Sequence, residues 1–126
     1  MRTKWSRSWN RSIQPRKQRK FIFNAPTHIR RKLFGAPLSK ELRKQHKKRT
    51  LTLRKGDTVK ILRGQFKGTM AKVESINTKK LRIYVKGVEQ TKATGQMAPY
   101  PIHPSNVMII TPDLSDKKRK EALARK

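Results

Sequence analysis

The sequence predicts a mainly β fold: a small barrel with a basic N-terminal extension that carries short helices, and a short C-terminal helix. One observation is that apolar and polar residues alternate from residue 50 onward, in short runs separated by turn residues. Another is that residues 1–50 hold 17 Lys and Arg against one acid, a net charge of +16. These patterns divide the chain into four predicted parts: a basic extended arm (1–23), a short helical extension (24–50), a barrel (51–112) and a C-terminal helical tail (113–126).

The N-terminal extension is predicted to change from disorder to helix along its length. Residues 1–23 show neither helical nor strand periodicity, which is typical of a disordered arm that becomes ordered on a partner. Asn24 followed by Pro26 is typical of a helix start, and this helix should end near Gly35. Ser39 is the expected cap of a second short helix.

The predicted strands follow a period of two, and turn residues separate them. We expect strands near residues 51–53, 58–62, 70–76, 81–85 and 107–110. A closed barrel would also remove the exposed edges of so small a sheet. A final helix, mostly solvated, should follow Ser115. The expected core residues are Leu51, Val59, Ile61, Val73, Ile83, Val85, Val107 and Ile109.

The net charge of +27, from 34 Lys and Arg against 7 Asp and Glu, points to a polyanionic partner. Self-repulsion on this scale opposes compaction, and nucleic acid is the polyanion that matches bases spread along the whole chain. The longest apolar run, residues 107–110, is far too short to span a bilayer, so we expect no membrane insertion. We also expect no homo-oligomer.

Neither a metal site nor an active site is predicted, and no cofactor is expected. Cysteine is absent, which excludes disulfides and Cys-based zinc sites. His28, His46 and His103 are widely separated, with few acids near them. The acids are scattered without motif spacing, and Asp57 is expected only to close a turn. The sequence therefore predicts a protein that is not an enzyme.

The segment from residue 55 to residue 73 carries the most specific pattern. Gly64 and Gly68 are expected to allow positive φ in a tight connection, which would leave Arg63 and Lys67 on an exposed loop. The segment reads Gly-Asp-x-Val-x-Ile-x-x-Gly-x-x-Lys-Gly and resembles the KOW motif, a β-hairpin signature of SH3-like barrels in ribosomal and transcription-factor proteins. Ala71 stands where members of the KOW family commonly have glycine, so we expect ordinary β backbone there.

The flanking sequences resemble one family in particular. Residues 16–20, 24–32 and 36–42, and Ile102-His103-Pro104-Ser105-Asn106-Val107 after the barrel, are similar to ribosomal protein twenty-four of the large subunit, called twenty-six in eukaryotes. The resemblance is to the archaeal and eukaryotic branch and covers about residues 14–115. An archaeal source is favoured, because the long basic tail of many eukaryotic members does not follow the last predicted helix.

The resemblance implies a structural protein of the large ribosomal subunit in the cytoplasm. It implies binding to the 5′ domain of the large-subunit rRNA, support of early assembly, and a place near the polypeptide exit tunnel among neighbouring ribosomal proteins. Lys and Arg would neutralise phosphates and position the protein, while RNA shape carries the specificity. The predicted rRNA-binding residues are Arg16, Lys17, Arg19, Lys20, His28, Arg30, Arg31, Lys32, Lys47, Lys48, Arg49, Arg54, Lys55, Arg63, Lys67, Lys79, Lys80, Lys92, His103 and Ser105.

Several alternatives remain open at this point. The basic run at residues 16–20 is also typical of a nuclear-targeting signal. Trp5 and Trp9 suit stacking on bases or packing equally, Phe66 suits an RNA or protein contact, and Phe21 and Phe23 favour packing. As a whole, the chain could be a transcription-elongation or RNA-chaperone module, or a DNA-compacting protein, although no recognition-helix pattern supports the latter.

Overall fold

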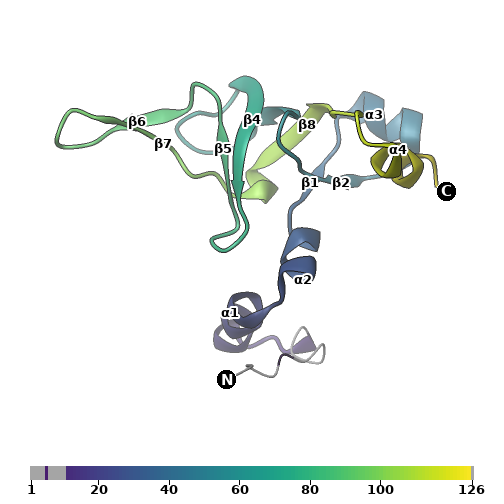
Figure 1. Ribbon diagram of the computed structural model, residues 1–126, viewed down its shortest axis with the longest axis horizontal. Helices are drawn as coiled ribbons and strands as arrows, with labels where there is room; N and C mark the ends of the chain where they lie inside the picture. The colour runs from purple at the N-terminus through teal and green to yellow at the C-terminus, as the bar shows by residue number, and fades with distance from the viewer. Residues whose placement is uncertain (1–4, 6–10, 126) are drawn as a thin grey trace.

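The computed structural model describes residue 5 and residues 11–125, and its centre is a strongly curved antiparallel sheet (Figure 1). The sheet has the strand order β5-β4-β3-β8, formed by Arg82–Val85, Met70–Asn77, Thr58–Ile61 and Val107–Thr111. Register shifts between Thr58 and Val59 and between Val73 and Ser75 bend the strands, as β-bulges do.

Bridges at both ends of this sheet extend it toward closure. Leu38 pairs with Ile109 beside β8, and Ile102 pairs with Ile83 beside β5. Two smaller sheets complete the β structure: β1 (Gly35–Pro37) with β2 (Thr50–Thr52), and β6 (Glu89–Thr91) with β7 (Met97–Pro99). The result is an open, barrel-like arrangement, which confirms the predicted fold class.

One apolar core fills the barrel. Seven of the eight predicted core residues are buried, because the alternating residues of each strand point to the same side of the sheet. Leu51 is the exception and is only half-buried. Phe34, Leu38, Leu53, Val88 and Ile102 join the core from connecting segments, where no periodicity marked them.

The N-terminal extension is more helical than predicted. Helix α1 (Pro15–Asn24) replaces the expected extended arm over those residues, because Pro15 suits a first turn and the following Arg, Lys and Gln residues favour helix. Asn24 ends this helix instead of capping the next one, so that part of the prediction was wrong. Helix α2 (Thr27–Lys32) begins after Pro26 and has no side-chain cap. Residues 1–4 and 6–10 of the predicted arm, including Trp9, lie outside the described residues.

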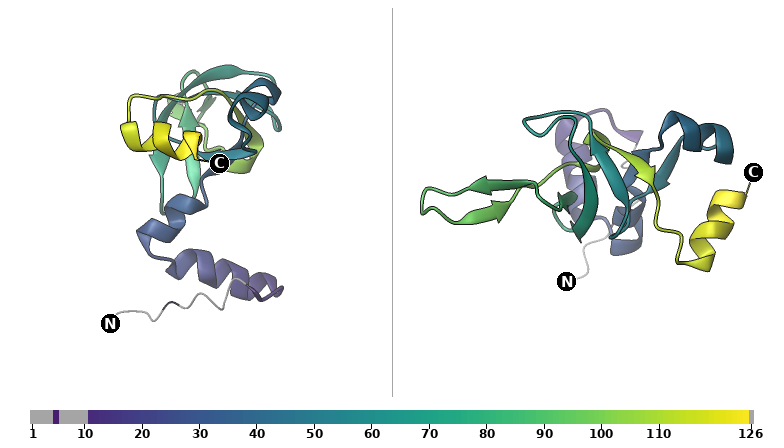
Figure 2. Two further views of the ribbon diagram at one scale, coloured as in Figure 1. Left: turned by 90° about the vertical axis from the view of Figure 1, so that its right-hand side faces the viewer. Right: turned by 90° about the horizontal axis from the view of Figure 1, so that it is seen from above.

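Figures 1 and 2 show α1 and α2 projecting from one side of the barrel, whereas α3 and α4 lie close to it. Helix α3 (Lys40–His46) begins after Ser39, whose hydroxyl accepts a hydrogen bond from the Leu42 backbone N–H at 3.4 Å, as predicted. The β6–β7 hairpin extends away from the barrel on the opposite side from α4 (Figure 1).

The C-terminal helix α4 (Lys117–Ala124) differs from the prediction in two ways. Its cap is Asp116, which accepts from the Lys118 backbone N–H at 2.9 Å, and not Ser115. It is also not simply solvated, because Arg119 and Leu123 are buried and Arg119 bonds to Asp57 of the barrel. A single turn of 3-10 helix, η2 (Pro104–Asn106), directly precedes β8.

The β3–β4 connection has the backbone that its glycines predicted. Gly64 and Gly68 have φ of 94° and 92°, and the Gly68 N–H closes the loop by donating to the Ile61 carbonyl at 2.8 Å. Ala71 lies within β4 and is not among the residues with positive φ, as expected.

We expect Gly68→Ala to lower the free energy of unfolding by about 1–2 kcal/mol, the cost of a left-handed backbone for a residue with Cβ. An added Cβ would meet nothing within 4 Å, so the loss would be conformational and not steric. Gly35→Ala is the matched control, because Gly35 is exposed and lacks positive φ. Urea unfolding should show little change for the control, and equal losses for both variants would contradict this account.

Candidate nucleic-acid interface

Most of the predicted rRNA-binding residues are exposed on separate elements of the fold. Four of them (Lys17, Arg30, Lys48 and His103) are half-buried. The others are spread over α1, α2, the segment after α3, the turn before β3, the β3–β4 loop, the β4–β5 turn, the β6–β7 hairpin and η2. The predicted binding residues therefore lie on several sides of the barrel, and some of them line two hollows.

The larger hollow is a groove of about 720 Å³ between α2, the β4–β5 turn and α4. Its basic lining brings together Arg31 and Lys32 of α2 with Arg54 and Lys55 before β3. Its apolar lining includes Phe34, Leu51, Leu53 and Ile76. This combination brings two pairs of basic residues from separate parts of the sequence to one surface that suits phosphates and the faces of bases.

The smaller hollow, about 180 Å³, lies beside the β3–β4 loop. Arg63 lines it together with His103 from the segment before η2 and Arg82 at the start of β5. Tyr100, Pro101 and Phe66 also line it. Lys67 is exposed in the same loop but does not line the hollow.

The His103 ring is held in a defined orientation. Its Nδ1 accepts a hydrogen bond from the Ser105 backbone N–H at 3.3 Å and lies 2.8 Å from the Ser105 hydroxyl. Since a backbone N–H can only donate, the neutral ring carries its proton on Nε2. Burial, and secondarily the Arg82 guanidinium, lower the pKa of His103. The ring is therefore a neutral hydrogen-bond donor near pH 7.

Lys79 and Lys80 are presented by a tight turn between β4 and β5. The Asn77 side chain accepts hydrogen bonds from both of their backbone N–H groups at 3.1 Å, as in an Asx-turn. Leu81, which follows, is buried with a positive φ of 51°. The turn is thus fixed at its base, and both lysine side chains are exposed.

Several of the predicted RNA-binding residues also have partners within the chain, among them Lys48, Arg30 and Arg54. Lys48 donates to the Ala122 carbonyl, which links the end of α3 to α4. Arg30 donates to the Phe23 carbonyl, and Arg54 pairs with Asp116. The Arg54 hydrogen bond, followed by that from the Lys118 backbone, lowers the pKa of Asp116. Arg30 therefore links α2 to α1, and Lys48 and Arg54 help to hold α4 in place.

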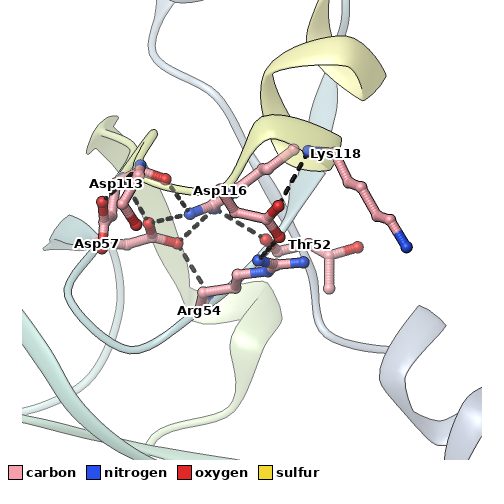
Figure 3. Close-up of polar contacts among 8 residues, drawn as sticks. Thr52, Arg54, Asp57, Asp113, Asp116 and Lys118 are labelled. Carbon is pink, nitrogen blue, oxygen red and sulfur yellow. Dashed lines mark hydrogen bonds and ion pairs between the residues drawn. The ribbon is translucent and has the colours of Figure 1, made fainter.

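A buried ion pair fixes α4 beside the groove. The Asp57 carboxylate accepts from the Arg119 guanidinium at 2.6 and 2.7 Å, and from the backbone N–H groups of Arg54 and Asp113 at 2.8 Å each. Arg119 also donates to the carbonyls of Asp113 and Thr52. Figure 3 shows these segments meeting around Asp57. Asp57 therefore does more than close a turn: it connects the barrel to the C-terminal helix.

The aromatic predictions had mixed outcomes. Phe21 is buried and its ring lies 5.0 Å from that of Trp5, so both pack. Phe23 is 78% exposed, and its predicted packing is not found among the described residues. Phe66 packs partly against the core and lies 5.2 Å from the Tyr100 ring.

Sequence reasoning missed three cations that line the hollows, Arg82, Lys118 and Arg119. Lys118 and Arg119 belong to a basic run at residues 117–120, and that run was the available signal. Arg82 had no such signal, because only the fold brings it beside the β3–β4 loop.

In the part of the chain that the structure describes, no helix is both long and apolar enough to cross a membrane.

The comparisons with known proteins agree on one family. Residues 12–126 match the family of eukaryotic ribosomal proteins L26 and their archaeal L24 counterparts. The large ribosomal subunit protein uL24 of Pyrobaculum islandicum is 51% identical over 115 residues, which cover 91% of this chain and 94% of that protein. These matches confirm the resemblance and the expected location in cytoplasmic ribosomes. The chain belongs to the ribosomal protein family that comprises eukaryotic L26 and its archaeal counterparts.

Proposed function

We propose that this protein is a structural constituent of the large ribosomal subunit that binds the 5′ domain of the large-subunit rRNA. It would support early assembly of the subunit and lie near the polypeptide exit tunnel, in contact with neighbouring ribosomal proteins. Its role is to hold RNA segments in place and not to catalyse a reaction.

The observation that supports this proposal most is the distribution of positive charge over the fold. The chain has a net charge of +27, and the described loops and helices around the barrel present cations in several directions. Such a molecule suits simultaneous contact with several RNA segments, because each face can neutralise a different backbone. Two basic hollows, each with apolar or aromatic lining, would accept parts of the RNA that are not in regular helices.

The test is sedimentation of cell lysate at low magnesium, where the ribosomal subunits separate, after a high-salt wash. We expect the chain to remain with the large subunit, and RNA–protein cross-linking should then place it on the 5′ domain. Recovery at the top of the gradient, or with RNA polymerase, would favour a transcription-elongation module instead.

A further inference from the structure

The small hollow beside the β3–β4 loop combines aromatic, cationic and amide groups that come from three separate segments. Arg63, Gln65 and Phe66 belong to the loop, Arg82 begins β5, and residues 100–106 supply the remaining wall. At about 180 Å³ it is smaller than the roughly 300–1,000 Å³ of pockets for whole small-molecule ligands. Its size and lining therefore suit one group of a larger partner.

The aromatic wall offers a surface for a flat ring. Tyr100 is half-buried, and the Phe66 ring lies beside it, with the two ring centroids 5.2 Å apart and the planes tilted by 57°. Both rings pack against the barrel core, so their positions are fixed before any ligand arrives. Exposed Pro101 adjoins Tyr100 and extends the apolar surface. Proteins that bind unpaired RNA use such aromatic surfaces to stack single bases.

The polar wall offers groups for a phosphate and for the edge of a base. Arg63 and Arg82 line the same hollow, and the planar guanidinium is well suited to phosphate. His103 supplies an Nε2–H donor, because Ser105 occupies its Nδ1. The amides of Gln65 and Asn106 contain both donors and acceptors. Apolar stacking alone would not require this set of groups.

We propose that this hollow takes up one unstacked nucleotide of the bound RNA, with its base against Tyr100 and its phosphate held by Arg63 and Arg82. This inference rests on the proposed function, since the nucleotide belongs to the rRNA. It adds Arg82 and Tyr100 to the interface and assigns the hollow to an extruded base instead of a backbone contact alone.

The first arm of the test is ultraviolet cross-linking of the full chain in complex with a 5′-domain rRNA transcript, followed by mass spectrometry of the peptides. We expect a nucleotide adduct on Tyr100 or His103. Adducts found only elsewhere on an RNA-bound chain would overturn the nucleotide site and leave the proposed function intact. A chain that does not bind the transcript at all would overturn both.

The second arm compares substitutions of Tyr100. Tyr100→Leu keeps an apolar side chain but removes the stacking surface, and should weaken RNA binding roughly 5- to 150-fold, the range for loss of one base–aromatic stack. Tyr100→Phe retains the ring and should bind as the unmodified chain does. Tyr84→Leu is the matched control, because Tyr84 is a half-buried tyrosine of β5 outside the hollow. Thermal unfolding of the free variants separates a binding defect from a folding defect.

Two results would contradict the assignment. Equal affinity of Tyr100→Leu and the unmodified chain would show that no base stacks there. Weakened binding by Arg63→Gln and Arg82→Gln without any effect of Tyr100→Leu would assign the hollow to a phosphate only.

Discussion

Asp57→Ala should lower the free energy of unfolding by about 3–5 kcal/mol, the usual loss when one member of a buried ion pair is removed. The side chains of Asp57 and Arg119 are 0% and 3% exposed. Without the carboxylate, the guanidinium would remain buried without its counter-charge, and the backbone N–H groups of Arg54 and Asp113 would lose their acceptor. Urea unfolding of the RNA-free protein measures the change.

A double-mutant cycle identifies the origin of this loss. Asp57→Ala combined with Arg119→Met should be more stable than Asp57→Ala alone, because no buried charge is then left unpaired. Glu74→Ala, which removes an exposed carboxylate on β4, is the control and should change stability by less than about 0.5 kcal/mol. A double variant as unstable as the sum of the single variants would show that Asp57 and Arg119 do not act as a pair.

Replacing the four bases of α1 by glutamine should weaken binding to 5′-domain rRNA on the order of 100-fold at physiological salt. If all four reach phosphates, the slope of log affinity against log salt should decrease by about 3, at roughly 0.7 per contact with unpaired RNA. Glutamine also favours helix, so α1 should persist. Filter binding over a series of salt concentrations gives both quantities. The substituted residues are Arg16, Lys17, Arg19 and Lys20.

A variant of equal net charge provides the control for this experiment. It replaces four exposed lysines outside the predicted interface, and its salt slope should decrease much less. Those lysines are Lys44, Lys86, Lys117 and Lys120. Equal slopes for the two variants would show that α1 contributes only to the overall field of the protein, without contacts of its own.

The sequence was sufficient where short-range rules decide the structure. Alternation placed the strands of the central sheet and most of its core, and a serine cap placed α3. Prediction from the sequence failed where tertiary contacts decide the local structure. Gly35 was expected at the end of a helix, yet α2 ends at Lys32 and Gly35 begins β1, because β2 provides a pairing partner. The β6–β7 hairpin was also missed, since all of its strand residues except Ala98 are exposed and they show no apolar alternation.

The same distinction between short-range patterns and tertiary contacts applies to the candidate interface. Clusters of bases on α1, α2 and the β3–β4 loop can be recognised from composition and motif. The two hollows cannot, because each is assembled from segments that are distant in sequence, such as those of Arg63 and Arg82. The role of Asp57 was likewise invisible, since its partner Arg119 follows 62 residues later, in a run of bases.

The order in which the strands pair has a consequence for synthesis of the chain. β3 pairs with β4 through a short loop, so this hairpin can form soon after both strands leave the ribosome. Its other neighbour, β8, is made only after residue 106, and Arg119 later still. A nascent chain interrupted before residue 119 would therefore contain a finished hairpin but a barrel with an uncompensated buried carboxylate. Such a product would unfold readily, which makes truncated copies easy targets for proteolysis before they can occupy a place in an assembling subunit.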